Sequence, residues 1–406
     1  MQRFYLISLF VIFSACKTRK ETASHIPVTV KQPVKDSAIT AKVEKSVEYR
    51  KFALSLLLSL NAPQYQTKDS LGNYLLNDVE SSNLNALEFY EGISLAKSKN
   101  DSNISIHVID IGDSLRLGKT LRDSSLKKSD LIIAVAPSSM NAVIAGFPGL
   151  QGIPLMFPLN QVPLRSYANK NNWSALPSNK SQCRQMAHYL NEKNPDAKYI
   201  IIYRDQNKNE SELADLFNDE LHVLLNDSVS RKLNYSVDGW IKLLKNLQTT
   251  KRNILILPSS DESFLSSLII KLDTQEQFPL LLAGLPTWEH FESIDMALLE
   301  NLNTYIFDAN YIDYENMEVK IFRKHFIDEY QSDPLLSAYL GYDIYNWINK
   351  NYSVKGVAID KYESKNTLLA PDNGFKFMRS CENCMMENQF MTVLLFKDGT
   401  LKIVNH

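Results

Sequence analysis

Beyond residue 50 the chain alternates short apolar runs with amphipathic segments, and this alternation restricts the fold more than any other feature. Several runs, such as Leu131–Ala136, are apolar throughout, which is typical of parallel strands covered on both faces. The predicted strands are Phe52–Leu58, Ile104–Asp110, Leu131–Ala136, Pro154–Phe157, Tyr199–Tyr203, Asn253–Leu257, Pro279–Ala283 and Thr304–Phe307. The predicted helices are Leu84–Lys99, Gln182–Asn191, Glu210–Leu225, Glu262–Leu272, Glu318–Tyr330 and Leu335–Asn349. This βαβα order predicts an α/β fold with right-handed crossovers.

The length of 406 residues predicts two lobes, because single cores tend to divide beyond ~250–300 residues. Crossovers containing Pro or Gly are expected at Pro158–Pro163 and Gly284–Trp288. We therefore assign residues 50–158 and 287–350 to the first lobe and residues 161–283 and 351–406 to the second. At the C-terminus, Phe390–Phe396 and Leu401–Val404 flank a Gly-containing turn and predict a hairpin.

Residues 1–16 resemble the lipobox signal of bacterial lipoproteins. Arg3 supplies a positive charge, residues 4–13 are mostly apolar, and Ser14 and Ala15 precede Cys16. The apolar run is too short to span a bilayer and has the flanks of an export signal. The resemblance implies cleavage before Cys16 and a lipid on its thiol; an uncleaved anchor or a chance cysteine is the alternative.

We therefore expect a lipoprotein signal peptide at residues 1–15 and a flexible, polar tether at residues 16–49. The protein is expected at the periplasmic face of the cell envelope, where the lipid anchors it to a membrane. Lys17 differs from the acidic residue that resembles an inner-membrane retention signal, which favours the outer membrane.

Composition and motifs exclude several classes of function. A net charge of −2 indicates no nucleic-acid partner. The sequence has no P-loop, no Gly-x-Gly-x-x-Gly and no Gly-x-Ser-x-Gly, so we expect neither an enzyme nor a bound cofactor. Cys183 lies on a helical apolar stripe and is predicted in the core, whereas Cys381 and Cys384 either form a local disulfide or stay reduced. No further Cys or His pair has the spacing of a zinc site.

Polar residues follow the predicted strands, where α/β sheets bind their ligands. Ser138 and Ser139 open a helix after Leu131–Ala136, and either cap that helix or meet a ligand carboxylate. Asp261 follows Asn253–Leu257 and either starts a helix or binds a ligand. Trp288 follows Pro279–Ala283 and either packs at a hinge or stacks on a ligand. Together these residue types are typical of a small-molecule cleft.

The order and spacing of several segments resemble type I periplasmic binding proteins, the leucine/isoleucine/valine-binding receptors and their relatives. The matching segments are residues 56–61, 89–96, 106–110, 136–139, 153–160 and 257–262. The resemblance implies two Rossmann-like lobes that are joined by three crossovers and close on a ligand by hinge motion.

The same resemblance implies roles for individual residues. Ser138 and Ser139 match the loop that holds the ligand carboxylate, and Leu159 and Asn160 match the second ligand loop. Tyr203 and Asp205 match the first binding turn of the second lobe, and Asp261 matches the acid that receives an ammonium group. Asn207–Glu210 replaces an aromatic-glycine pair that is frequent in the family, and Asn160–Pro163 replaces a Ser- and Ala-rich crossover.

Two functions compatible with this fold remain open. The first is a lipid-anchored solute-binding protein, similar to the substrate-binding component of an ABC transporter, that closes on a small amino-acid-like ligand. The second is an envelope lipoprotein that contacts a cell-wall synthesis protein, as an activator or scaffold for peptidoglycan synthesis. Fold alone does not separate them, because function resides in sites.

Overall fold

The structure, a computed structural model, describes residues 51–63, 80–99, 103–112, 114–159, 169–225, 230–352, 363–364 and 374–405. The predicted signal peptide, the tether, Cys16 and Asn160 lie outside these residues. Within them, no helix is both long and apolar enough to cross a membrane. The same part of the chain contains no group of His, Cys, Asp or Glu that is suited to holding a metal ion.

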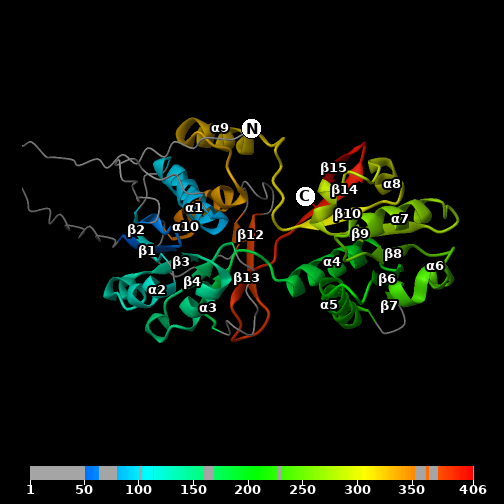
Figure 1. Cartoon of the computed structure of the whole chain (residues 1–406), viewed down its shortest axis with the longest axis horizontal. Coiled ribbons are helices and arrows are strands. Elements are labelled where there is room, and N and C mark those ends of the chain that lie inside the picture. The colour runs from blue at the N-terminus through cyan, green and yellow to red at the C-terminus, as the bar shows by residue number, and fades with distance from the viewer. Residues whose placement is uncertain are drawn as a thin grey trace, which may run out of the picture. The chain divides into compact units, whose positions relative to one another are not determined.

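Two mixed sheets form the centres of two Rossmann-like lobes (Figure 1). In lobe 1 the strand order is β11 (Glu363–Ser364), β12 (Phe375–Arg379), β13 (Met386–Asn388), β5 (Asn172–Ser174), β4 (Leu155–Phe157), β3 (Leu131–Val135), β1 (Phe52–Leu58) and β2 (Ile104–Asp110). In lobe 2 it is β15 (Thr400–Ile403), β14 (Thr392–Lys397), β10 (Tyr305–Asp308), β9 (Leu280–Gly284), β8 (Asn253–Ile256), β6 (Lys198–Tyr203) and β7 (Ser230–Asn234). The strands from β1 to β5 and from β6 to β10 pair in parallel, and apolar strands such as β3 and β8 do so as their sequences predict.

Helices cover both faces of each sheet. Lobe 1 carries α1 (Ser81–Ser98), α9 (Met317–Tyr330) and α10 (Leu336–Tyr352) on one face, and α2 (Ser114–Thr120) and α3 (Ser138–Gly146) on the other. Lobe 2 carries α4 (Asn179–Lys193) and α5 (Lys208–Leu224) on one face, and α6 (Tyr235–Asn246), α7 (Glu262–Asp273) and α8 (Met296–Asn301) on the other. Successive strand residues therefore enter different cores: Leu56 and Leu58 pack with α1 and α10, whereas Leu57 packs with α2 and α3.

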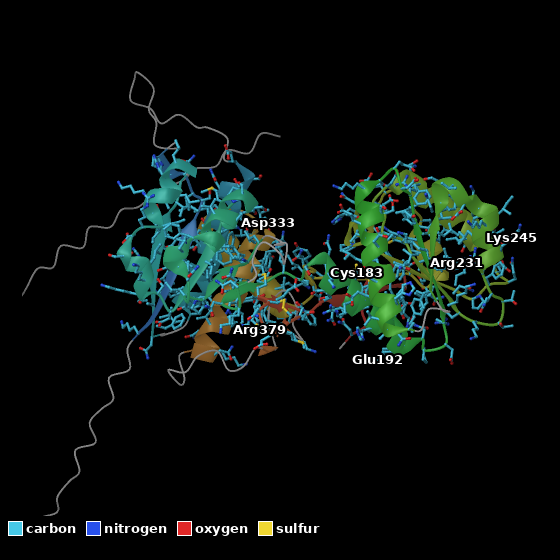
Figure 2. The ribbon with its side chains drawn as sticks, turned by 90° about the horizontal axis from the view of Figure 1, so that it is seen from below. Cys183, Glu192, Arg231, Lys245, Asp333 and Arg379 are labelled. Carbon is cyan, nitrogen blue, oxygen red and sulfur yellow. A yellow bond between two sulfur atoms is a disulfide. The ribbon has the colours of Figure 1, made fainter. Side chains whose placement is uncertain are left out.

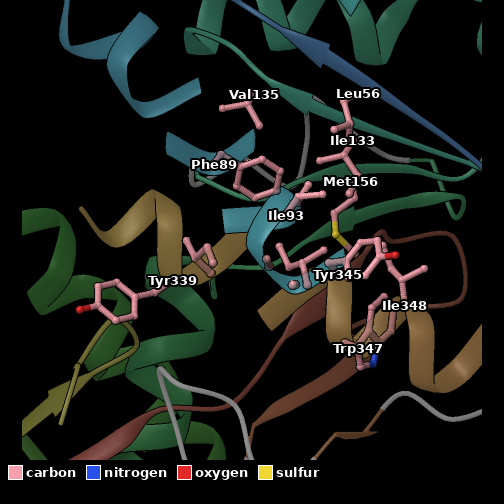
Figure 3. Close-up of a cluster of buried hydrophobic side chains, with 14 of the residues drawn as sticks. Leu56, Phe89, Ile93, Ile133, Val135, Met156, Tyr339, Tyr345, Trp347 and Ile348 are labelled. Atoms are coloured by element: carbon pink, nitrogen blue, oxygen red, sulfur yellow. The ribbon is translucent and has the colours of Figure 1, made fainter. Parts of the chain in front are cut away.

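The largest core lies between α1, α10 and the sheet of lobe 1. Figure 3 shows Phe89 and Ile93 from α1 beside Ile133 and Met156 from the strands, with Trp347 from α10. The two helices come unusually close where a glycine of each faces the backbone of the other. A Cβ on Gly92 would lie 2.0 Å from the carbonyl oxygen of Ala338, so only glycine fits there.

Sheet membership corrects the predicted lobe boundaries. β10, expected in the first lobe, pairs with β9 and β14 in lobe 2. β5, β12 and β13, expected in the second lobe, belong to the sheet of lobe 1. The sequence does not reveal this, because β5 and β13 are short and the apolar pattern of β10 fits either sheet. In the described part of the chain, the crossings between lobes follow β5, β10 and β13.

The C-terminal elements include the predicted hairpin and a local disulfide. β14 and β15 pair antiparallel around Asp398 and Gly399, which both have positive φ. Cys381 and Cys384 form a disulfide in the turn between β12 and β13, drawn as a yellow bond in Figure 2. Cys183, labelled in the same view, is buried on α4 and confirms the predicted core position.

Candidate functional site

The N-terminus of α3 lies at the carboxyl end of β3, a central strand of lobe 1. β3 ends at Val135, and α3 begins at Ser138 with Pro137 as its N-cap. Proline has no side-chain acceptor, so no side chain caps the helix, and both Ser138 and Ser139 are exposed. Free N–H groups at a helix N-terminus attract anions. The geometry does not fit the alternative in which a serine caps the helix, and the carboxylate role of Ser138 and Ser139 stays a prediction.

The neighbouring loop of lobe 1 is held in place by Asp110 at the end of β2. Its Oδ1 accepts the N–H groups of Asn61 at 3.0 Å and Gly112 at 2.8 Å, and its Oδ2 accepts that of Ala62 at 3.0 Å. Asn61 has a φ of 49°, which the bonded loop sustains. The acid at the end of β2 therefore shapes this edge rather than offering a free charge.

Leu159 is the remaining predicted site residue of lobe 1 that the structure describes, and it is apolar. Leu159 is partly buried and packs against the core between α1 and α10. The second ligand loop, which the resemblance assigns to Leu159 and Asn160, therefore stays a prediction.

In lobe 2 an arginine that the sequence analysis did not single out organises the edge of the sheet. Arg204 directly follows β6, and its Nη1 donates to Asp261 at 2.8 Å. Its Nη2 bonds Glu210, and its Nε donates to the same carboxylate at 3.2 Å. The hydroxyl of Ser259, after β8, also donates to Glu210, at 2.7 Å. One guanidinium thus joins the turn after β6 to the turn after β8.

Electrostatics in this network follow from those contacts. The hydrogen bond with Glu210 is the main cause that raises the pKa of Arg204. Asp261 is the N-cap of α7, and the N–H of Phe264 followed by Arg204 lowers the pKa of its carboxyl. Asp261 is therefore an ionised cap that already has a cationic partner. An ammonium group that binds it must compete with Arg204.

An open pocket of about 380 Å³ lies over the network. Besides Arg204 and Asp261 it is lined by Gln206, Asn207, Lys208 and Asn209. The guanidinium carbon of Arg204 lies 4.3 Å from the centre of the Phe264 ring, which supports the floor of the pocket. Asp205 is exposed and Tyr203 is half-buried in the same turn. The structure thus brings Tyr203, Asp205 and Asp261 to one edge.

Trp288 lies below this edge. It is 2% exposed, and its indole N–H donates to the carbonyl of Ser259 at 2.8 Å. A Cβ on Gly284 would come within 2.6 Å of the indole ring, so the tryptophan packs directly on the end of β9. The burial of Trp288 fits packing at a hinge and not stacking on a ligand.

Two acids near the ends of neighbouring strands were not predicted as site residues. Glu289 follows β9, and Asp308 ends β10. Burial, followed by the charge of Asp308, raises the pKa of Glu289 to about 7, and burial raises the pKa of Asp308. Among the described residues, Glu289 Oε1 is buried without a hydrogen-bond partner. For Asp308 the sequence did offer a signal, since this acid directly follows the predicted apolar strand Thr304–Phe307.

Comparison with known proteins identifies the fold. No family model and no curated protein matches the chain. LpoA from Haemophilus influenzae superposes with a TM-score of 0.59 at 15% identity, over 87% of this chain and 58% of that one. Its C-domain, described as a regulator of PBP1A, gives 0.55 at 15% identity, over 87% of this chain and 99% of that one.

A putative branched-chain amino acid ABC transporter protein from Rhodospirillum rubrum gives a TM-score of 0.60 at 11% identity, over 87% of this chain and 99% of that one. This chain thus spans less than two thirds of LpoA, but almost the whole of the LpoA C-domain and of the Rhodospirillum rubrum protein. Such low identities establish the fold alone. With its two parallel-cored sheets and three crossings, the chain has the fold of type I periplasmic binding proteins.

Proposed function

We propose that the chain is a lipid-anchored solute-binding protein of the cell envelope that closes its lobes on a small amino-acid-like ligand. One observation carries the proposal: among the described residues, the sheet edges of the two lobes present unsatisfied groups of opposite polarity. In that part of the chain, lobe 1 offers the N-terminus of α3, which has no side-chain cap, and lobe 2 offers the buried oxygen of Glu289, which lacks a hydrogen-bond partner, beside Asp308. A zwitterion can satisfy both groups, because its carboxylate accepts from the N–H groups of α3 and its ammonium group donates to Glu289.

The roles of the individual residues follow. Ser138 and Ser139 receive the carboxylate through backbone N–H groups and hydroxyls. Glu289 and Asp308 attract the ammonium group, while Asp261 stays with Arg204. Tyr203, Asp205, Leu159 and Asn160 belong to the surrounding binding loops. The protein is not an enzyme in this proposal, and Cys16 carries the lipid that holds it at the membrane.

A ligand screen by thermal shift, followed by calorimetry, tests the proposal. Amino acids, small peptides and muropeptides are compared with analogues that lack either the amino or the carboxyl group. Micromolar binding corresponds to ~8 kcal/mol, and a hydrogen bond to a charged group contributes ~1.5–3 kcal/mol. An analogue that lacks either group is therefore expected to bind at least about tenfold more weakly.

Ser138→Asp tests the site on α3. The new carboxylate occupies the anion position, yet an acid in the first turn of a helix does not destabilise it. Binding is expected to fall by tenfold or more. Ser81→Asp is the matched control, since Ser81 is the exposed first residue of α1. Unchanged affinity in Ser138→Asp would place the ligand elsewhere.

A scaffold for peptidoglycan synthesis is the second candidate, and the Arg204 network favours it. The protein's own guanidinium neutralises the acid that the resemblance assigns to a ligand. The similarity in fold to the C-domain of LpoA, described as a regulator of PBP1A, supports this function equally well. No stabilisation by any solute, together with specific capture of a purified penicillin-binding protein, would replace the first proposal by this one.

A further inference from the structure

Three consecutive polar residues are buried where the chain crosses between the lobes. Glu387, Asn388 and Gln389 are 3%, 5% and 7% exposed. Apolar residues flank this polar run on both sides. Glu387 and Asn388 end β13 in lobe 1, and β14 of lobe 2 begins at Thr392. Buried polar side chains need hydrogen-bond partners, so their partners define what this run does.

Glu387 reaches from the sheet of lobe 1 to a helix of lobe 2. Its Oε1 accepts the N–H of Ser178, the N-cap of α4, and its Oε2 accepts the hydroxyl of Ser181 in the first turn. Among the residues that the structure describes, Glu387 has no ion pair with a basic side chain. The positive end of α4 therefore provides the compensation that a buried carboxylate requires.

The two residues after Glu387 extend the contact to Ala175 and further along α4. Asn388 donates from Nδ2 to the carbonyl of Ala175 at 3.1 Å, on the first crossover just after β5. Gln389 donates from Nε2 to Ser181 Oγ at 3.2 Å, and its Oε1 accepts from Gln185 at 3.3 Å. The first and third crossovers are thus joined along their length by side chains.

We propose that Glu387, Asn388 and Gln389 form a hinge clamp, which fixes the direction in which α4 leaves lobe 1 and so sets the resting arrangement of the two lobes. Glu387 is its central residue, because its two carboxylate oxygens accept from two residues at the N-terminus of α4, Ser178 and Ser181. The clamp restricts lobe motion to bending around the first and third crossovers. The proposal concerns the ligand-free protein and does not depend on which function the site has.

Distances between the lobes test the clamp. Spin labels are introduced in the full chain as noncanonical residues at Val143 of α3 and Val237 of α6, which are 54% and 76% exposed and leave the cysteines untouched. Pulsed EPR then measures the distance distribution without ligand. Glu387→Ala is expected to give a roughly twofold broader distribution, because the two lobes lose a common anchor. Glu382→Ala is the matched control, because Glu382 is an exposed acid in the turn between β12 and β13. It is expected to give the wild-type distribution.

A folded Glu387→Ala protein with the wild-type distribution would overturn the proposal, as would equal broadening in the Glu382→Ala control. If Glu387→Ala does not fold, the double variant Ser181→Ala/Gln389→Ala removes the clamp partners on both crossovers and keeps the carboxylate. It is expected to broaden the distribution in the same direction. A wild-type width in that variant would also refute the clamp. Because no ligand is added, these outcomes are separate from those of the binding screen.

Discussion

Replacing Arg204 by alanine tests whether one ion-pair network holds the turns after β6 and β8 together in lobe 2. The substitution removes the only cation that contacts Glu210 among the described residues. Glu210 is 1% exposed, so its charge stays in the interior after the change. The donors that remain are the backbone N–H of residue 204 at 3.0 Å and the Ser259 hydroxyl at 2.7 Å.

The expected loss of unfolding free energy follows from that geometry. Removing one partner of a buried ion pair costs about 3–5 kcal/mol, because an uncompensated charge is left behind. The two remaining donors place this case at the lower end, about 3 kcal/mol. Asp261 adds little, since its side chain is 41% exposed and solvent screens its pair with Arg204.

Urea unfolding of the full chain, combined with hydrogen exchange of the β6 and β8 amides, measures the effect. Lys208→Ala is the matched control in the same pocket. Lys208 and its partner Glu212 are 86% and 62% exposed, so their pair is expected to contribute no more than about 0.5 kcal/mol. The double variant Arg204→Ala/Glu210→Gln removes the stranded charge and is expected to recover part of the loss.

A loss below about 1 kcal/mol for Arg204→Ala, indistinguishable from Lys208→Ala, would refute the reasoning. So would a double variant Arg204→Ala/Glu210→Gln that recovers none of the loss.

Three further predictions rest on other parts of the chain. Gly92→Ala is expected to lower the unfolding free energy by about 1–3 kcal/mol, because its Cβ would lie 2.0 Å from the Ala338 oxygen. Gly118→Ala, with nothing within 4 Å, is expected to be neutral or stabilising, and equal urea midpoints would contradict this contrast. Burial raises the pKa of Glu88 from 4.5 to about 7, so its contribution to stability is complete below the unfolded pKa and lost as pH rises through 7. Glu88→Gln is expected to flatten that part of the pH-stability curve, and an unchanged slope would count against it. Cys16→Ser is expected to abolish incorporation of labelled palmitate in cells, and persistent labelling would disprove lipidation at Cys16.

Much of the architecture was predictable because strand and helix periodicities are local. The bounds predicted for β1 and β2, Phe52–Leu58 and Ile104–Asp110, are those observed. The polar turn at Ser138 was also predictable, since an apolar strand that leads into a helix exposes its N-terminal amides at the sheet edge. β7 was missed because Ser230–Asn234 is a polar edge strand with no apolar alternation.

The site was predictable only in part. Ser138, Ser139, Asp205 and Asp261 lie at the expected strand ends, but the sequence does not show which charges they meet. Arg204 lies between two residues that were singled out, and only the pairing of β6 with β8 brings it to Asp261. The burial of Trp288 likewise depends on the packing of η5 (Pro286–His290) against the end of β9.

Local periodicity specifies the alternation of strands and helices, the parallel cores and the strand ends at which polar residues gather, because each depends on neighbouring residues in the chain. Long-range packing, in contrast, assigns β5, β10 and β13 to their lobes and buries Glu387–Gln389. These outcomes depend on contacts between segments distant in sequence: the Glu387 carboxylate meets Ser178 and Ser181 across more than 200 residues. A polar run has no periodicity to mark such a contact, so its burial emerges only when β13 pairs with β5 and α4 presents its N-terminus.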